Sequence, residues 1–304
     1  MAHWREGQVR TEDGLDLYWQ SWHPAELRAL VVVVHGLAEH SGRYDRAARS
    51  FADAGLATYA LDHRGHGKSP GLRVHVDSFD ELRADVRAVL ALARAEHPTL
   101  PRFLLGHSQG GLVAATLALR EPEGLAGLVL SSPLLGIAER SRPSPLRAAV
   151  GRVLASLFPR TLFRSDVDPT LLSRDPAVGV AYAADPLVSH AVSAGWYRAL
   201  RRALTEAHDR APSLHVPTLV LYAGADALVD PEATTRWVAL GPQGFVEAFR
   251  YDGLYHEILN APERARVERH IEGWISQQMR CRRESTGLAL AAGAKDPRAR
   301  KTPP

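Results

Sequence analysis

The chain has 304 residues, 45% hydrophobic and 23% charged, which is typical of one globular domain with a sizeable core and excludes disorder over most of the length. A membrane-spanning segment is also excluded, because the longest apolar run covers only residues 29–34 and a bilayer requires about 20 residues. Residues 280–304 carry a net charge of +5, so the formal net charge of +3 for the whole chain leaves −2 for residues 1–279. This near-neutral remainder gives no indication of nucleic-acid binding.

Apolar, β-branched runs that suit strands alternate with helical patterns along the chain. Strands are predicted at residues 15–22, 30–34, 57–61, 103–105, 127–131, 218–222 and 246–251. Helices are predicted near residues 43–54, 79–96, 109–120, 231–240 and 261–278. This alternation predicts an α/β fold, in which helices flank a mostly parallel sheet.

Two of the predicted helices have recognisable starts. Asp230 followed by Pro231 is typical of an N-cap with proline at the first helical position. Residues 260–263 (NAPE) resemble a capping box, so the last helix is expected to begin there.

Residues 134–212 interrupt the alternation. These 79 proline-rich residues separate two core strands, whereas a simple crossover helix needs far fewer. An insertion after the carboxyl end of a strand is expected to form a cap over the active face. The predicted organisation is therefore an α/β core at 1–133, a helical cap at 134–212, a second part of the core at 213–279, and a disordered basic tail at 280–304.

The predicted cap contains an apolar stripe at helical spacing. It comprises Leu146, Val150, Val153, Leu154 and Leu157, and it is flanked by Arg147, Arg152, Arg160 and Arg164. Such a basic amphipathic helix can rest on lipid as a peripheral membrane contact. The alternative is that the stripe packs against the core.

The strongest local motif is residues 106–110 (GHSQG), which match the pattern G-x-S-x-G. In this motif Ser108 occupies a sharp, strained turn between a strand and a helix, and the glycines leave room for the turn. The amides at the start of the following helix favour developing negative charge. Its position between a predicted strand and a predicted helix favours a nucleophile over a plain strand–helix turn.

A serine hydroxyl needs a base, and the base needs an orienting acid. Asp226 follows the strand at 218–222, and His256 follows the strand at 246–251, so both are expected at the sheet edge that carries Ser108. The order serine, acid, histidine fits the nucleophile-elbow fold. The predicted triad is therefore Ser108, Asp226 and His256, with Asp230 assigned to a helix cap.

The oxyanion of an acyl-transfer intermediate requires two preorganised amides. One is expected from Gln109, the residue after the nucleophile. The other is expected from Leu37, in the loop after the strand at 30–34. His35, in the same loop, is expected to have a structural role.

Six segments within residues 10–278 closely resemble the monoacylglycerol lipase and lysophospholipase branch of the α/β-hydrolases. They are residues 35–44 (HGLAEHSGRY), 62–69 (DHRGHGKS), 106–111 (GHSQGG), 184–187 (ADPL), 224–226 (GAD) and 255–257 (YHE). The resemblance implies cleavage of a small lipid ester through an acyl-enzyme on Ser108, without metal or organic cofactor. It also implies that Glu39, Arg43 and Tyr182 bind the head group. The alternative for Glu39 and Arg43 is an internal ion pair that fixes the loop. Leu259 stands where mammalian members carry a further histidine.

Two other functions remain open from the sequence. One is a peptidase, non-lipid esterase or acyltransferase of the same fold, and the other is a non-catalytic module that binds a small ligand. A cytoplasmic location is expected, because residues 1–6 are polar and lack the apolar segment of a secretory signal. The single cysteine, Cys281, excludes an intrachain disulfide and a Cys-based zinc site.

Overall fold

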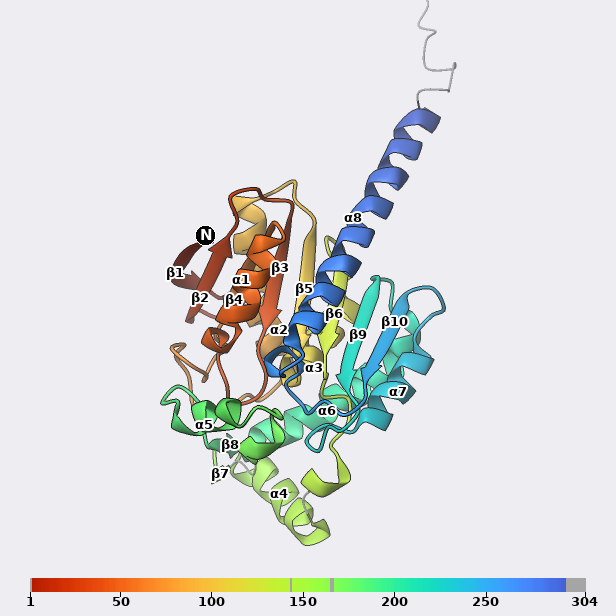
Figure 1. Ribbon diagram of the computed structural model, residues 1–304. Coiled ribbons are helices and arrows are strands. Elements are labelled where there is room, and N and C mark those ends of the chain that lie inside the picture. The colour runs from red at the N-terminus through yellow and green to blue at the C-terminus, as the bar shows by residue number, and fades with distance from the viewer. Residues whose placement is uncertain (1, 143, 165–166, 294–304) are drawn as a thin grey trace, which may run out of the picture.

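The structure is a computed structural model that describes residues 2–142, 144–164 and 167–293. Its centre is an eight-stranded sheet in the order β1-β2-β4-β3-β5-β6-β9-β10 (Figure 1). The strands are β1 (His3–Arg10), β2 (Asp16–His23), β3 (Ala29–Val34), β4 (Leu56–Leu61), β5 (Arg102–His107), β6 (Gly127–Ser131), β9 (Thr218–Ala223) and β10 (Val246–Tyr251). Within this sheet, β2 pairs antiparallel with β1 and β4, and the other described pairs are parallel, so the α/β fold with a mostly parallel sheet is confirmed.

Helices cover both faces of the sheet and bury a hydrophobic core on each. One core involves α1 (Asp45–Asp53) and α8 (Arg264–Gly293). The other involves α2 (Phe79–Glu96), α3 (Gln109–Arg120), α6 (Ala194–Arg210) and α7 (Pro231–Leu240). Because every residue of β3, β4, β6 and β9 is buried, these strands read as continuous apolar runs, as expected for the interior of a parallel sheet.

Strand β1 was not predicted from the sequence. Its residues alternate between exposed and half-buried along a largely polar segment, and it pairs with β2 at the edge of the sheet. An edge strand that buries little apolar surface has no strong hydrophobic pattern. Its formation therefore depends on hydrogen bonds to β2.

The last helix differs from the prediction at both ends. It begins at Arg264, because the side chain of Asn260 does not cap it but accepts a hydrogen bond from Arg46 and donates one to Glu257. It continues to Gly293, so a disordered tail from residue 280 is wrong for residues 280–293. That segment is rich in arginine, alanine and leucine, which are strong helix formers. Residues 294–304 of the predicted tail lie outside the described residues.

The insertion between β6 and β9 lies beyond the carboxyl ends of the strands (Figure 1). It contains η2 (Glu139–Ser141), α4 (Pro145–Leu157), β7 (Leu162–Arg164), η3 (Pro169–Leu171), α5 (Pro176–Ala184) and β8 (Ala191–Ser193). Strands β7 and β8 form a small antiparallel sheet. Buried alanines of α6 already belong to the main core, so we propose that the cap ends near the start of α6 rather than at residue 212.

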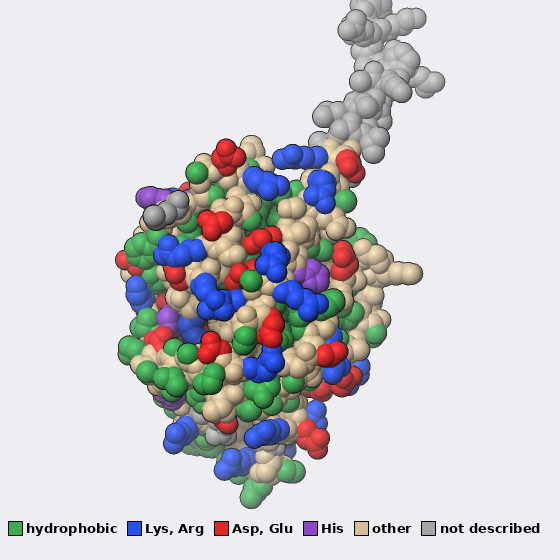
Figure 2. Space-filling model, in the orientation of Figure 1, with side chains coloured by type: hydrophobic (Ala, Val, Ile, Leu, Met, Phe, Trp, Pro, Cys, Tyr) green, Lys and Arg blue, Asp and Glu red, His purple; other side chains and the backbone are tan. Residues whose placement is uncertain are grey.

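The apolar stripe of α4 faces outward. Leu146, Val150, Val153 and Leu157 are 75%, 48%, 57% and 66% exposed, and Ala155 is the helix's one fully buried residue. The alternative that this stripe packs against the core is therefore wrong. In Figure 2, hydrophobic and basic side chains gather at the lower end of the molecule, where Figure 1 shows α4. Within the described ranges, no helix is long and apolar enough to span a bilayer.

Candidate active site

Ser108 lies at the sharp turn between β5 and α3. Its backbone has φ 52° and ψ −119°, a conformation that residues other than glycine rarely adopt. The turn is close-packed, because a Cβ at Gly106 would lie 2.4 Å from the Gly110 carbonyl oxygen, and one at Gly110 would lie 2.1 Å from the Val34 carbonyl oxygen. The two glycines are therefore sterically required, and the fold presents Ser108 at the carboxyl edge of the sheet.

Asp226 and His256 meet at the same edge, from the loops after β9 and β10. His256 Nδ1 lies 2.7 Å from Asp226 Oδ2, and both side chains are almost fully buried. The other carboxylate oxygen, Oδ1, accepts the backbone N–H groups of Leu228 and Val229 at 2.9 Å each. Both oxygens of the acid are thus held, so the imidazole is fixed with Nδ1 toward Asp226 and Nε2 available to another group.

His256 has the electrostatics of a general base. Burial lowers the pKa of His256, but the Asp226 carboxylate and its hydrogen bond outweigh burial, so the pKa lies above its ordinary value. The neighbouring His107 ring lies 4.8 Å from the His256 ring, centroid to centroid. Burial and the charge of His256 lower the pKa of His107 to about 4, so His107 is neutral near pH 7.

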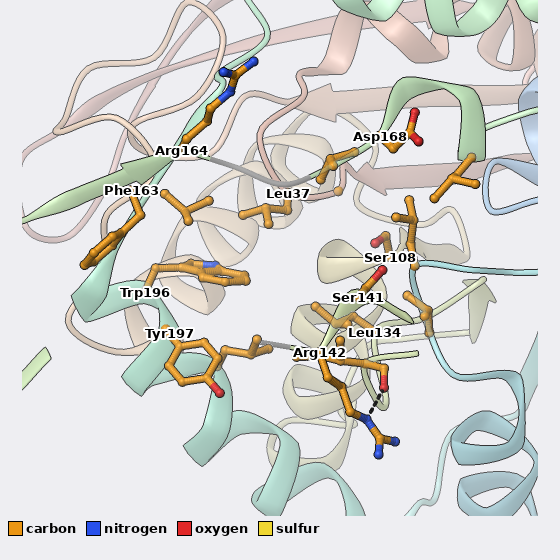
Figure 3. A pocket seen from close by; sticks show the side chains of 18 of the residues that line it. Leu37, Ser108, Leu134, Ser141, Arg142, Phe163, Arg164, Asp168, Trp196 and Tyr197 are labelled. Carbon is orange, nitrogen blue, oxygen red and sulfur yellow. Dashed lines mark hydrogen bonds between the residues drawn. The ribbon is translucent and has the colours of Figure 1, made fainter. Parts of the chain in front are cut away.

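Ser108 and His256 line one cavity of about 1010 Å³ under the cap. Among the described residues no hydrogen bond joins them, and catalytic hydrogen bonds of this kind often tighten only in the complex with substrate. Figure 3 shows Ser108 facing this cavity, with Leu37 and Trp196 across from it and Phe163 and Tyr197 farther along the wall. The cavity is mainly apolar, large enough for an acyl chain, and in reach of the serine.

Neither of the two amides expected to form the oxyanion hole donates a hydrogen bond to another described residue. Gln109 is the first residue of α3, so its N–H has no acceptor within the helix. The Leu37 N–H donates no hydrogen bond within the described residues. The side chain of Gln109 is buried and accepts a hydrogen bond from the Trp196 indole, which ties the turn at Ser108 to α6.

The loop that carries Leu37 is fixed from both sides. Glu39 accepts the Gly36 N–H at 2.6 Å, and His35 accepts the His63 N–H at 3.0 Å through Nε2. Burial and the charge of His63 lower the pKa of His35 to about 3, so His35 is a neutral hydrogen-bonding residue. The geometry agrees with a structural role for His35. No group of three potential ligands within the described part of the chain could hold a metal ion.

A buried charge cluster lies at one end of the cavity. Arg43 binds Glu39 at 2.8 Å and holds both oxygens of Glu257, at 2.6 and 2.8 Å. Its guanidinium carbon also lies 4.8 Å from the centre of the Tyr182 ring, which α5 contributes from the cap. Glu39 and Arg43 thus form the internal ion pair that was one alternative, and both still line the cavity.

Sequence reasoning missed Glu257. This residue directly follows His256, lines the cavity and is 4% exposed, and it completes the pairing of Arg43. Its position next to the histidine was a signal, but its partner lies 214 residues away in the sequence. Burial lowers the pKa of Arg43, whereas Glu257 and Glu39 raise it above the ordinary value, so the guanidinium stays charged.

The chain is similar to characterised proteins over most of its length. A sequence profile of the family described as serine aminopeptidase S33 matches residues 25–263. The chain is 39% identical over 264 residues to the monoacylglycerol lipase of Mycolicibacterium smegmatis, covering 86% of this chain and 93% of that protein. It is 34% identical to phospholipase YtpA of Bacillus subtilis, covering 85% and 98%. The solved monoacylglycerol lipase of Paleococcus ferrophilus aligns with TM-score 0.77 and 33% identity, covering 86% and 99%.

Proposed function

The chain belongs to the serine aminopeptidase S33 family and is a carboxylic ester hydrolase of the monoacylglycerol lipase type, and we propose that Ser108, His256 and Asp226 carry its reaction on lipid monoesters. The observation that carries this proposal is the 2.7 Å contact between His256 and Asp226 at the wall of the cavity that Ser108 also lines.

The proposed reaction has two half-reactions. The Ser108 hydroxyl attacks the ester carbonyl while His256 Nε2 takes its proton, and the Leu37 and Gln109 amides stabilise the oxyanion. His256 then protonates the leaving alcohol, which leaves the fatty acyl group on Ser108. In the second half-reaction His256 takes a proton from a water molecule that attacks the acyl carbonyl. The bond to Ser108 then breaks, the fatty acid is released, and His256 returns the proton to the Ser108 oxygen. Asp226 keeps a hydrogen on His256 Nδ1 throughout and stabilises the imidazolium that forms when Nε2 is protonated.

The charge cluster supports a neutral head group. Glu39, Arg43 and Glu257 together leave one negative charge at the polar end of the cavity, where the resemblance places the glycerol moiety. Hydroxyl groups can donate hydrogen bonds to these carboxylates, and the Tyr182 hydroxyl makes no hydrogen bond within the described residues. An anionic phosphodiester at this position would be repelled. We therefore propose monoacylglycerols over anionic lysophospholipids as substrates.

The test of this preference is a comparison of kcat/KM for monoolein and for oleoyl lysophosphatidylglycerol. We expect the wild type to prefer monoolein. Glu257→Gln should shift the ratio toward the anionic lipid by about tenfold, because one unit charge a few ångströms away is removed while Arg43 keeps Glu39 as a partner.

The matched control is Glu123→Gln, which removes the same charge from an exposed position outside the cavity lining. It should leave the ratio at the wild-type value. A wild type that cleaves both lipids equally, or a Glu257→Gln variant with an unchanged ratio, would contradict the proposed selection by charge.

The cap gives no support to a peptidase that binds a substrate amine. Asp175 caps α5, and Asp185 bonds to His40 at 2.9 Å. Asp168 lines the cavity, but its carboxylate caps η3 through the Thr170 N–H. Asp166 lies outside the described residues. These three carboxylates are therefore engaged in the fold, and an ester substrate remains the better assignment.

We also propose that the cap contacts the membrane peripherally through α4, with the protein in the cytoplasm. The support is the exposed apolar stripe of α4 beside the cavity, whose lining includes Leu146 and Val150. Replacing Val153 and Leu157 by serine should weaken binding to phosphatidylcholine vesicles at least about tenfold, because two apolar side chains no longer enter the lipid. Vesicle co-sedimentation measures this change.

The control for this prediction is serine at Leu72 and Leu240, which are 43% and 44% exposed outside the cap. That variant should bind vesicles like the wild type. Unchanged binding of the variant at Val153 and Leu157 would show that α4 does not enter the lipid.

A further inference from the structure

A second cavity, of about 600 Å³, lies between α4 and α6 and is lined on one side by Arg152, Ala155 and Ser156. The other side is the exposed face of α6, from Tyr197 to Asp209. We call this space the α4–α6 groove. Of the described residues, only Tyr197 lines both the groove and the catalytic cavity. The groove therefore lies between the cap and α6, separate from the catalytic cavity, and the proposed reaction does not use it.

Positive charge without partners is concentrated in the groove. Arg152, Arg201 and Arg202 are exposed there and make no ion pair or hydrogen bond within the described residues. A fourth arginine, Arg198, donates to the Ala155 carbonyl and to Asp77, but its Nε is buried with no partner in the described chain. Four guanidinium groups from two helices thus line one cavity.

Two carboxylates of the groove offset this charge only in part. Glu206 pairs with Arg120 and lies 3.6 Å from Arg83, so it is committed to arginines outside the groove. Asp209 lies at the far end and has no basic partner within the described residues. The groove therefore keeps a net positive charge and suits an anion with several acceptor oxygens. Guanidinium forks match the oxygens of phosphate in this way.

The surface beside the groove identifies which phosphate would bind. On α4, Arg152 and Ser156 each immediately precede a residue of the exposed apolar stripe, Val153 and Leu157. A ligand whose phosphate occupies the groove would therefore have an apolar surface next to it. A phospholipid in a membrane has both parts, because its phosphate lies at the membrane surface and its acyl chains lie directly beneath it.

We propose that the α4–α6 groove binds the phosphate of an anionic phospholipid at the membrane surface and so orients the cap on the lipid. This inference rests on the proposed membrane contact of the cap. It predicts that membrane binding depends on the negative charge of the lipid, whereas binding through the apolar stripe alone would not.

The experiment compares co-sedimentation of the full chain with vesicles of phosphatidylcholine alone and with added phosphatidylglycerol. The wild type should bind the anionic vesicles more tightly. The variant Arg201→Gln with Arg202→Gln should lose about tenfold of its affinity for anionic vesicles, with little change for phosphatidylcholine. Arg152→Gln should reduce affinity in the same direction.

The matched control is Arg94→Gln with Arg269→Gln, which removes the same net charge from exposed arginines outside the groove that make no ion pair in the described chain. It should bind anionic vesicles like the wild type. An equal loss in this control would overturn the groove in favour of attraction by net charge. Equal binding of the wild type to both kinds of vesicle would also overturn it.

A further arm separates a lipid head group from a free phosphate ion. Glycerol 3-phosphate and inorganic phosphate are added without vesicles while Tm is measured. A rise in Tm that Arg201→Gln with Arg202→Gln abolishes, without any effect of vesicle charge, would make the groove a small-anion site and overturn the lipid assignment.

Hydrolysis of a soluble short-chain ester by all variants separates failure of this inference from failure of the proposed function. The groove variants should retain wild-type hydrolysis, because the groove is separate from Ser108.

Discussion

Replacing Ser108 by alanine should lower kcat for monoolein hydrolysis on the order of 10⁵–10⁶-fold, because no acyl-enzyme can form. What remains would come from substrate binding and the oxyanion amides. The fold should be retained, since the Ser108 hydroxyl makes no hydrogen bond within the described residues. Initial rates from a sensitive fatty-acid assay measure the loss of kcat, and thermal unfolding measures whether the fold is retained.

The control for this variant is Ser141→Ala. Ser141 lines the same cavity (Figure 3), but its hydroxyl is already engaged, because it donates a hydrogen bond to the Ala227 carbonyl. Its activity should stay near the wild-type value. If Ser108→Ala turned over monoolein as fast as Ser141→Ala, another group would have to be the nucleophile.

Replacing Asp226 by asparagine should lower kcat about 10⁴-fold without disturbing the fold. The side-chain carbonyl oxygen of the introduced asparagine can still accept the Leu228 and Val229 N–H groups, as Asp226 Oδ1 does. Its amide nitrogen then faces His256 Nδ1, which must become an acceptor and leave the hydrogen on Nε2. His256 in that tautomer cannot take the proton from Ser108.

The pH dependence provides a second readout for this variant. The acid limb of kcat/KM reports the pKa of His256, which must be neutral to act as base, so activity falls as pH falls through that pKa. Because Asp226 holds this pKa above its ordinary value, loss of its charge should move the acid limb to lower pH.

The control is Asp230→Asn, at the N-cap of α7 four residues further on. Asparagine caps helices as well as aspartate does, so activity and acid limb should both be unchanged. Comparable rates for Asp226→Asn and Asp230→Asn would show that Asp226 does not orient His256 in the proposed reaction.

The parts of the fold that the sequence predicted are those with strong local patterns. The buried strands are continuous apolar runs, and each predicted strand has a counterpart in the sheet. Ser108, Asp226 and His256 lie on the loops expected from their strands, because parallel strands bring their carboxyl ends to one edge. Local chemistry also predicted the start of α7. The helix begins at Pro231, and the side chain of its N-cap, Asp230, accepts the Glu232 N–H.

The parts that were missed depend on contacts between distant segments. Arg43 and Glu257 form a pair across 214 residues, and nothing in the local sequence of either specifies the other. The stripe of α4 has the same spacing whether it faces lipid or core, so periodicity alone could not orient it. The start of the last helix was wrong for a similar reason, since Asn260 bonds to Arg46 from another element.

The most direct test of the proposed relay is to locate the adduct of a fluorophosphonate by mass spectrometry of the digested protein. One modified residue, Ser108, is expected in the wild type, with no label in Ser108→Ala. His256→Ala should react much more slowly at the same serine, because the hydroxyl loses its base. Labelling of a different serine, or equally fast labelling of wild type and His256→Ala, would contradict activation of Ser108 by His256.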